Sequence, residues 1–339
     1  MRETATKTPV LIIFFNRPEV LKKVFSAVKK AKPATLLLAQ DGAREGNARD
    51  AENVEKCREI VDNIDWECTV YRNYSDVNLS CDHREFTAID WAFGIVDRLI
   101  ILEDDCLPCS TFFPFCDELL EKYKDDERVD RISGYNRLEK YKDISCDYFF
   151  STIAAGYGWA TWKRNWERIV NQKDFSFLDD KDLVKVFDSS RKIIADRNYG
   201  DILGQCRNVR KKDLETGKYT SWELLVGVNS LINGSLIITP RYNMVVNIGA
   251  TADATHYTEY RFSDAVVRKM LKMKSYDIEF PLKHPEHVIR DANYEKKHYK
   301  AIHKSPVKKA ALKLDVFGRR LAHGDFKGIG RAIKRRISG

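Results

Sequence analysis

The stretch Val10-Leu-Ile-Ile-Phe-Phe15, followed directly by Asn16-Arg17-Pro18, sets a pattern that the first part of the chain repeats. Its unbroken apolar run predicts a strand that is buried on both faces, as strands of parallel sheets are. Pro18 is favourable in the first turn of a helix. The segment after it carries apolar residues at helical spacing, namely Val20, Leu21, Val24, Phe25 and Val28. We therefore expect a strand, a short polar loop and an amphipathic helix.

The same alternation continues as far as residue 102. The predicted elements are a strand at Thr35–Gln40, a polar helix near Ala48–Asn63, a strand at Thr69–Arg72, a helix across Glu85–Asp97 and a strand at Leu99–Leu102. Strands that alternate with helices predict βαβ units and a parallel sheet covered on both faces. We therefore expect an α/β fold whose loops after the strands line one edge of the sheet, where open α/β sheets bind ligands.

The composition is that of a folded globular protein. The 339 residues are 43% hydrophobic and 32% charged, and a domain size of about 150 residues predicts roughly two structural units. We divide the chain into an α/β half (residues 1–135), a second half of the same domain (136–262) and a C-terminal extension (263–339). The longest apolar run, residues 10–15, is too short to span a bilayer, and the N-terminus lacks a secretory pattern. We expect a cytoplasmic protein whose eight cysteines are free thiols.

Positive charge is concentrated at the C-terminal end. The net charge is +8, but residues 296–339 hold 14 Lys or Arg and 2 Asp, which gives +12 there and −4 for the rest. Apolar residues recur at helical spacing between these charges, first at Val307, Ala311, Leu314, Phe317 and Leu321, then at Phe326, Ile329, Ile333 and Ile337. We expect basic amphipathic helices that either pack on the body or attract an anionic membrane surface. Nucleic acid is not expected as a partner, because the body is acidic and the tail lacks a recognised nucleic-acid-binding signature.

Polar side chains follow three of the predicted strands. These are Asn16 and Arg17, Asp41 in Gln40-Asp41-Gly42, and the acidic triplet Glu103-Asp104-Asp105. Because the carboxyl ends of parallel strands meet at one edge, we expect these groups to converge. A guanidinium suits a phosphate group, although an exposed arginine before a helix fits Arg17 equally well. Asp41 suits a hydrogen bond to a base, while Asp-Gly by itself favours a simple turn.

The acidic triplet is the more specific signal, because it comes directly after the apolar run Leu99–Leu102. Unpaired buried carboxylates are costly, so these must face solvent or a cation. Carboxylate oxygens select Mg²⁺ or Mn²⁺, typically together with substrate phosphates. The alternative is that one acid caps a helix that begins near Ser110. Zinc at Cys106-x-x-Cys109 is disfavoured because two further ligands at suitable spacing are missing, and the glycine patterns of P-loop and Rossmann proteins do not follow the first strand.

Several groups of residues, in order along the chain, resemble the GT-A nucleotide-sugar glycosyltransferases. The similarity is greatest to bacterial relatives of the animal N-acetylglucosaminyltransferase that starts complex N-glycan branching. It covers about residues 9–258. It is carried by Val10–Pro18, Gln40-Asp41-Gly42, Ile100-Ile-Leu-Glu-Asp-Asp105, Phe112-Phe113, Gly156-Tyr-Gly-Trp-Ala-Thr-Trp-Lys163 with Trp166, Ser221-Trp-Glu223, and Asn247-Ile-Gly249 followed by Ala254-Thr-His256.

The resemblance implies a GT-A fold in which the first half binds a nucleotide-sugar and the second half holds the acceptor. Asp105 would ligate Mn²⁺ or Mg²⁺ at the diphosphate, and Glu103 and Asp104, with it the family's DXD-type motif, would support metal and ribose. Arg17, beside Asn16, would lie near the diphosphate, and Asp41 near the base. The implied activity is transfer of a sugar from a nucleoside diphosphate, foremost a UDP-sugar, to a glycan or lipid-linked acceptor in surface polysaccharide biosynthesis.

An inverting transfer requires a general base within hydrogen-bond reach of the acceptor hydroxyl. The family usually has an Asp after the Trp of this motif, and here Glu223 stands at that place, with one more methylene in its side chain. The alternative is structural, because Thr220-Ser-Trp-Glu223 also fits a capping box at the start of an apolar helix.

Three tryptophans follow the second glycine of Gly156-Tyr-Gly158. Their spacing, at Trp159, Trp162 and Trp166, predicts one core-facing helical stripe. We assign Trp162 and Trp166 to the core, and Gly158 and Trp159 to the donor site, where a glycine turn and an aromatic ring would approach the sugar. His256 has two interpretations, as a metal or phosphate ligand and as a structural residue.

The sequence departs from the family ahead of the third helix. Relatives usually carry a glycine-rich basic turn there, whereas this chain has Asn78-Leu-Ser-Cys-Asp-His-Arg-Glu85, so that Arg84 or His83 is expected to supply the missing cation. Two other functions compete with glycosyl transfer. A non-catalytic nucleotide-sugar or glycan-binding protein would keep the Asp105 pocket without a base. A sugar-1-phosphate nucleotidyltransferase is the enzymatic rival, although its glycine-rich, Arg-containing loop is missing.

Overall fold

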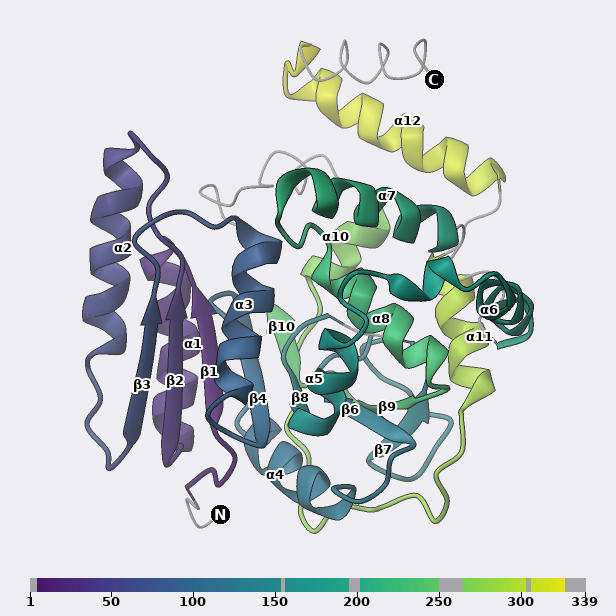
Figure 1. Ribbon diagram of the computed structural model, residues 1–339, viewed down its shortest axis with the longest axis horizontal. Coiled ribbons are helices and arrows are strands. Elements are labelled where there is room, and N and C mark those ends of the chain that lie inside the picture. Colours follow the sequence, from purple (N-terminus) through teal and green to yellow (C-terminus); the bar gives the residue numbers. More distant parts are fainter. Residues whose placement is uncertain (1–4, 154–155, 195–201, 250–264, 303–305, 327–339) are drawn as a thin grey trace.

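The computed structural model describes residues 5–153, 156–194, 202–249, 265–302 and 306–326. It shows an α/β protein built on one mixed, mostly parallel sheet of eight strands, flanked by helices (Figure 1). In spatial order the strands are β3 (Thr69–Tyr74), β2 (Thr35–Gln40), β1 (Val10–Phe14), β4 (Arg98–Glu103), β8 (Trp159–Trp162), β6 (Val129–Ser133), β9 (Leu236–Pro240) and β7 (Tyr148–Ser151). A two-stranded sheet pairs β5 (Cys106–Pro108) with β10 (Val245–Asn247).

Helices cover both faces of the large sheet. One face packs on α1 (Pro18–Ala31), α2 (Ala48–Val61) and α4 (Phe112–Lys122). The other face packs on α3 (Cys81–Phe93), α5 (Lys163–Val170), α6 (Lys181–Ile194), α7 (Ile202–Thr216) and α8 (Trp222–Ile232), with a short 3₁₀ helix at Ser176–Asp179. The C-terminal part adds α10 (Ala265–Leu271), α11 (Ala292–Ile302) and α12 (Pro306–Ala322), and α12 lies furthest from the sheet (Figure 1).

The opening segment folds as its pattern predicts. All five residues of β1 are buried, and they alternate between the two cores, with Ile12 on the side of α1 and Leu11 on the side of α3. The residues that α1 buries are the predicted Val20, Leu21, Val24, Phe25 and Val28. The apolar surface that α1 and β1 share thus closes the sheet on one face.

The order of the strands reverses beside β1. The chain runs outward from β1 to β2 and β3, and then returns to place β4 on the opposite side of β1 in parallel pairing. The loops after β1 and β4 consequently leave the same edge in different directions. Open α/β sheets form a ligand crevice at such a point.

Two expectations from the sequence need correction. Helix α3 begins at Cys81, four residues before the predicted start, because its first turn is polar and shows no apolar periodicity. The tryptophan stripe does not form one helical face, because Trp159 and Trp162 belong to strand β8 and only Trp166 lies on helix α5. Side chains three positions apart on a strand point to opposite faces, so Trp159 enters the core under α3 while Trp162 enters the core under α4.

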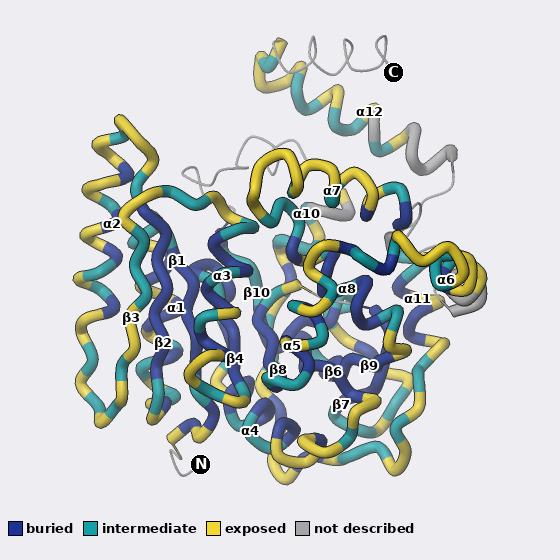
Figure 2. Tube along the Cα trace, in the orientation of Figure 1, coloured by how far each residue is buried: buried dark blue, intermediate teal, exposed yellow. Residues whose placement is uncertain are grey.

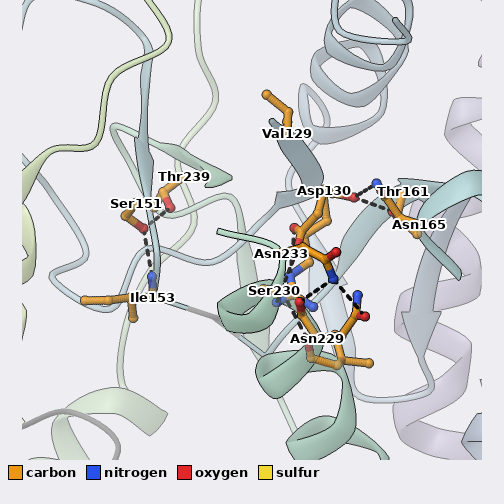
Figure 3. Close-up of polar contacts among 12 residues, drawn as sticks. Val129, Asp130, Ser151, Ile153, Thr161, Asn165, Asn229, Ser230, Asn233 and Thr239 are labelled. Atoms are coloured by element: carbon orange, nitrogen blue, oxygen red, sulfur yellow. Dashed lines mark hydrogen bonds and ion pairs between the residues drawn. The ribbon is translucent and has the colours of Figure 1, made fainter. Parts of the chain in front are cut away.

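A buried polar cluster joins β6 to strand β8 and to helices α5 and α8 (Figure 3). The register of β6 shifts between Val129 and Arg131, and the backbone carbonyl of Asp130 there accepts hydrogen bonds from Thr161 (2.6 Å) and Asn165. The hydroxyl of Ser230 on α8 donates to the Asp130 carboxylate and accepts from Arg131 (2.9 Å). The register shift in β6 thereby joins this strand to its neighbour β8 and to helices α5 and α8.

The remaining observations concern the whole chain. One continuous sheet contains strands from both sides of residue 135. All eight cysteines are free. Among the described residues, no helix has both the length and the apolar character needed to cross a bilayer. The predicted stripe that starts at Phe326 lies almost wholly outside the described residues.

Candidate functional site

A cavity of about 430 Å³ opens at the carboxyl ends of β1, β2 and β4, beside the start of α3. It lies where the strand order reverses. Its lining gathers most of the residues that the sequence singled out, namely Asn16, Arg17, Asp41, Arg84, Glu103, Asp104 and Asp105. The expectation that these groups converge at one edge of the sheet is confirmed.

Arg17 lies between two carboxylates of the acidic triplet. Its guanidinium forms an ion pair with Asp104, which is almost fully buried, and Nη1 lies 2.9 Å from Oδ2 of Asp105. The backbone N–H of Phe15 also donates to Asp104, at 3.3 Å. Burial raises the pKa of Asp104 to about 6, against the lowering effect of Arg17. Burial also lowers the pKa of Arg17, but the two carboxylates outweigh it and leave that pKa above its usual value.

Glu103, Asp105 and Cys106 place one ligand atom each within 4.8 Å of the others, on a half-buried to buried turn after β4. Burial raises the pKa of the Cys106 thiol well above its usual value, and the two carboxylates supply the oxygen atoms that a hard cation prefers. Burial, with the charges of Glu85 and Asp105, also raises the pKa of Glu103 well above its usual range. A divalent cation that prefers oxygen ligands fits this excess of negative charge.

The segment Asn247–Gly249 closes over Asp105. The N–H of Ile248 donates to the Asp105 carbonyl at 2.8 Å, and β10 pairs with β5 directly beyond it. A Cβ atom on Gly249 would lie 2.2 Å from Asp105 Oδ2 and 2.8 Å from Arg17 Nη1. Only glycine therefore leaves room for this loop against the carboxylate. Asn247 itself lines the cavity.

Asp41 forms the turn that Asp-Gly favours and also lines the cavity. Its Oδ1 accepts the N–H groups of Gly42 (3.0 Å) and Leu79 (2.8 Å). Burial raises its pKa above the usual value. The turn therefore fixes the carboxylate at the cavity wall and ties β2 to the segment before α3.

Of Arg84 and His83, it is Arg84 that lines the cavity. Arg84 is 4% exposed, and its Nη2 donates to the carbonyl of Asn73 (2.5 Å) and to the Asn73 side chain (3.0 Å). His83 instead accepts the Tyr219 N–H at 3.2 Å and stacks on that ring. The structure thus distinguishes two residues that the sequence could not.

Asn16 also borders the cavity, but its amide faces helix α2. Nδ2 donates to Asp50 Oδ1 at 2.7 Å, and the same carboxylate binds Arg44, whose guanidinium lies 5.7 Å from the Phe15 ring centroid. Asn16 therefore positions the wall made by Arg44 and Phe15.

Glu223 lies in the first turn of α8, beside the turn Gly156-Tyr157-Gly158. A Cβ atom on Gly156 would lie 3.6 Å from Glu223 Oε1, and Tyr157 lines the cavity. Burial, and then the charge of Asp82, raises the pKa of Glu223 above its usual value. The alternative capping box is wrong, because Ser221 makes no side-chain cap and Thr220 donates to Asp213 at 2.6 Å.

Glu85 is a site residue that the sequence did not reveal as such. It lines the cavity from α3, is 9% exposed, and accepts hydrogen bonds from the indole of Trp222 and from the Cys81 thiol (3.0 Å). Burial raises its pKa to about 7. Because Trp222 precedes Glu223, this contact links the cavity wall to the start of α8.

Gly158 and Trp159, like Glu223, are not among the residues that line the cavity. Gly158 has φ of +59°, and its Cα faces Val245, whose side chain a Cβ atom would meet at 2.9 Å. Trp159 is 6% exposed and stacks on Trp222, with centroids 6.0 Å apart. Both residues therefore have packing roles next to the site. His256 lies outside the described residues.

The cavity therefore brings together Arg17, the carboxylates of Glu103 and Asp105, and the buried Glu85. Comparison with known proteins adds no family to this description, since no family model and no curated protein matches the sequence.

Proposed function

We propose that this chain is a metal-dependent, inverting glycosyltransferase of the GT-A type. It moves a sugar from a nucleoside-diphosphate sugar, foremost a UDP-sugar, to a glycan or lipid-linked acceptor in surface polysaccharide biosynthesis. The observation that carries this proposal is the meeting of Arg17, Glu103 and Asp105 in one cavity at the point where the strand order reverses.

The donor side follows from the charges at that point. Asp105 and Glu103 hold Mn²⁺ or Mg²⁺, and such an ion neutralises the charge that develops on the departing diphosphate. Arg17 is adjacent, with Nη1 2.9 Å from Asp105, and its planar fork of donors suits a phosphate oxygen pair. Asp41 and Arg84, both almost fully buried, form the wall of the cavity beside α3 and receive the nucleoside.

Glu223 acts as the general base. Its carboxylate takes the proton of the acceptor hydroxyl while that oxygen bonds to the anomeric carbon, and the bond from that carbon to the diphosphate breaks with its electron pair on the diphosphate. A raised pKa suits this role, since a base works best when its pKa lies close to the working pH. Glu223 is exposed and lies beside the turn at Gly156, where a Cβ atom would lie 3.6 Å from its Oε1.

The first test is a thermal-shift panel of UDP-, GDP-, dTDP- and CMP-sugars, each with and without Mn²⁺. A ligand that binds only the folded state raises the melting temperature. We expect a Mn²⁺-dependent rise with one nucleotide, lost in Asp105→Ala and retained in the control Asp62→Ala, whose exposed carboxylate forms an ion pair with Arg72. The absence of any shift in the wild-type protein would contradict the donor site.

Products then separate this function from its rivals. A glycosyltransferase releases a nucleoside diphosphate, and the release requires both donor and acceptor. A nucleotidyltransferase releases pyrophosphate from a nucleoside triphosphate. Donor binding without turnover over a panel of glycan and lipid-linked acceptors favours the non-catalytic binding protein.

A further inference from the structure

Helix α12 presents an apolar stripe to solvent. Leu314, Phe317 and Leu321 are 70%, 45% and 45% exposed, and Phe326, just after the helix, is 69% exposed. The first three stand at i, i+3 and i+7, so they share one helical face. Figure 2 shows α12 standing apart from the buried body of the protein. Apolar side chains gathered on one exposed face mark an interaction surface.

The opposite side of α12 faces the body. Asp315 accepts a hydrogen bond from Arg268 of α10 at 2.9 Å, and Arg319 of the same helix donates to it at 3.1 Å. Leu312 and Val316, next to Asp315 on this side, are half-buried. These contacts fix which face of α12 is turned toward the body. The apolar stripe lies on the opposite face and is therefore exposed.

The charge around the stripe is positive. Residues 306–326 hold five Lys or Arg and two Asp, and the whole of 296–339 carries +12. Both acids in this helical segment have arginine partners, since Asp315 pairs with Arg268 and Arg319, and Asp325 pairs with Arg320. The segment therefore carries a net positive charge. A second copy of the same tail would meet it with like charge, which disfavours self-association through this face.

We propose that α12 docks along its length on an anionic lipid bilayer. Leu314, Phe317 and Leu321 enter the boundary between headgroups and acyl chains, and the basic residues of the C-terminal segment contact lipid phosphates. An exposed apolar face with flanking positive charge is the combination that binds such surfaces. No helix among the described residues spans a bilayer, so this contact is an association with the surface. It stands independently of the proposed function, and where that function also holds, it brings the cavity to the membrane that carries lipid-linked acceptors.

The test is sedimentation of the full-length protein with vesicles of phosphatidylcholine alone and of phosphatidylcholine with phosphatidylglycerol. We expect binding to the anionic vesicles that weakens with salt. The variant Leu314→Ser/Phe317→Ser/Leu321→Ser should bind at least about tenfold more weakly, since burial of the apolar face supplies much of the affinity. The matched control is Leu214→Ser on α7, where an apolar side chain is 77% exposed, and its binding should stay unchanged.

A second variant keeps the proposal open to refutation if the triple serine variant misfolds. Lys308→Gln/Lys309→Gln/Lys313→Gln leaves the apolar stripe intact and should lose the preference for anionic vesicles. Unchanged binding in both variants would overturn the proposal, as would equal binding of the wild-type protein to both vesicle types. Light scattering tests the alternative that a second copy of the chain covers this face. If the wild-type protein is a dimer and the triple serine variant is a monomer, the face is a dimer interface.

Discussion

Arg17 is the residue on which the charge balance of the cavity depends. Its guanidinium already neutralises Asp104 and lies 2.9 Å from Asp105, so it competes with any cation for the same carboxylate oxygens. A bound phosphate offers Arg17 an alternative partner. We therefore expect the Arg17 side chain to oppose the binding of a cation alone and to support the binding of a cation together with a diphosphate.

This competition predicts opposite effects of one substitution. Arg17→Ala should raise the affinity for Mn²⁺ alone by roughly tenfold, since removal of a nearby positive charge favours a second one, and should lower the affinity for a nucleoside diphosphate in the presence of Mn²⁺. Calorimetric titrations with each ligand measure both. Arg128→Ala is the control, because Arg128 pairs with Asp126 and is not among the residues that line the cavity. Weaker binding of both ligands by Arg17→Ala would show that Arg17 does not compete with the ion.

The second prediction at this scale concerns pH. Burial and Asp82 both raise the pKa of Glu223, and only the ionised carboxylate accepts a proton, so transfer should increase as pH rises through that raised pKa. Glu223→Gln should lose roughly 10²- to 10⁴-fold in rate with donor affinity unchanged. Asp82→Asn removes a negative charge, lowers the pKa of Glu223 and moves the pH profile of the rate toward lower pH. An Asp82→Asn profile identical to that of the wild-type protein would argue against Glu223 as the base.

Residues of the site differ in how far the sequence could reveal them. Arg17, Asp41 and Asp105 follow apolar strands directly, and parallel strands bring their carboxyl ends to one edge, so their convergence was predictable. Glu85 was not predictable, because its partner Trp222 lies 137 residues away in the chain. The fold brings the Glu85 and Trp222 side chains together, and no local sequence pattern predicts that contact.

Elements show the same division between local and distant causes. The buried residues of helix α1 could be predicted one by one, because one face of the helix packs on the sheet and the apolar residues of that face recur at regular helical spacing. The start of α3 and the change from strand to helix after Trp162 could not. Strand β8 exists because β4 and β6 pair with it on either side, and a spacing of three between tryptophans is ambiguous without those neighbours.

The cluster that ties β6 to α8 gives a prediction at the scale of elements. Ser230→Ala should lower the free energy of unfolding by about 1–3 kcal/mol, because it leaves the buried Asp130 carboxylate and Arg131 guanidinium each short of a hydrogen-bond partner. Denaturant unfolding monitored by circular dichroism measures this. Ser189→Ala is the matched control, since Ser189 is exposed and bonds only locally, to the Val186 carbonyl at 2.8 Å. Equal effects of the two substitutions would show that the buried cluster adds nothing to stability.

At the scale of the molecule, the main sheet joins both halves of the chain. Strand β4 from the first half pairs antiparallel with β8 from the second, and the core under α3 contains residues from both, such as Phe86 and Trp166. Within the described residues, the two halves thus share one sheet and one core. The division at residue 135 therefore falls inside a single sheet.

This continuity predicts one cooperative transition for the body of the protein. Tryptophan fluorescence and far-ultraviolet circular dichroism should give coincident thermal transitions, since a two-state change looks the same to every probe. Removal of residues 306–339 should change the melting temperature by only about one or two degrees, because the described contact of α12 with α10 is a surface ion pair, and such pairs contribute roughly 0–1 kcal/mol. The same truncation should abolish vesicle binding. Two separate transitions, with one of them preserved in a fragment of residues 1–135, would contradict the prediction that the body unfolds as one cooperative unit. A large loss of stability on truncation would mean that the C-terminal segment is packed on the body and is not available to bind a membrane.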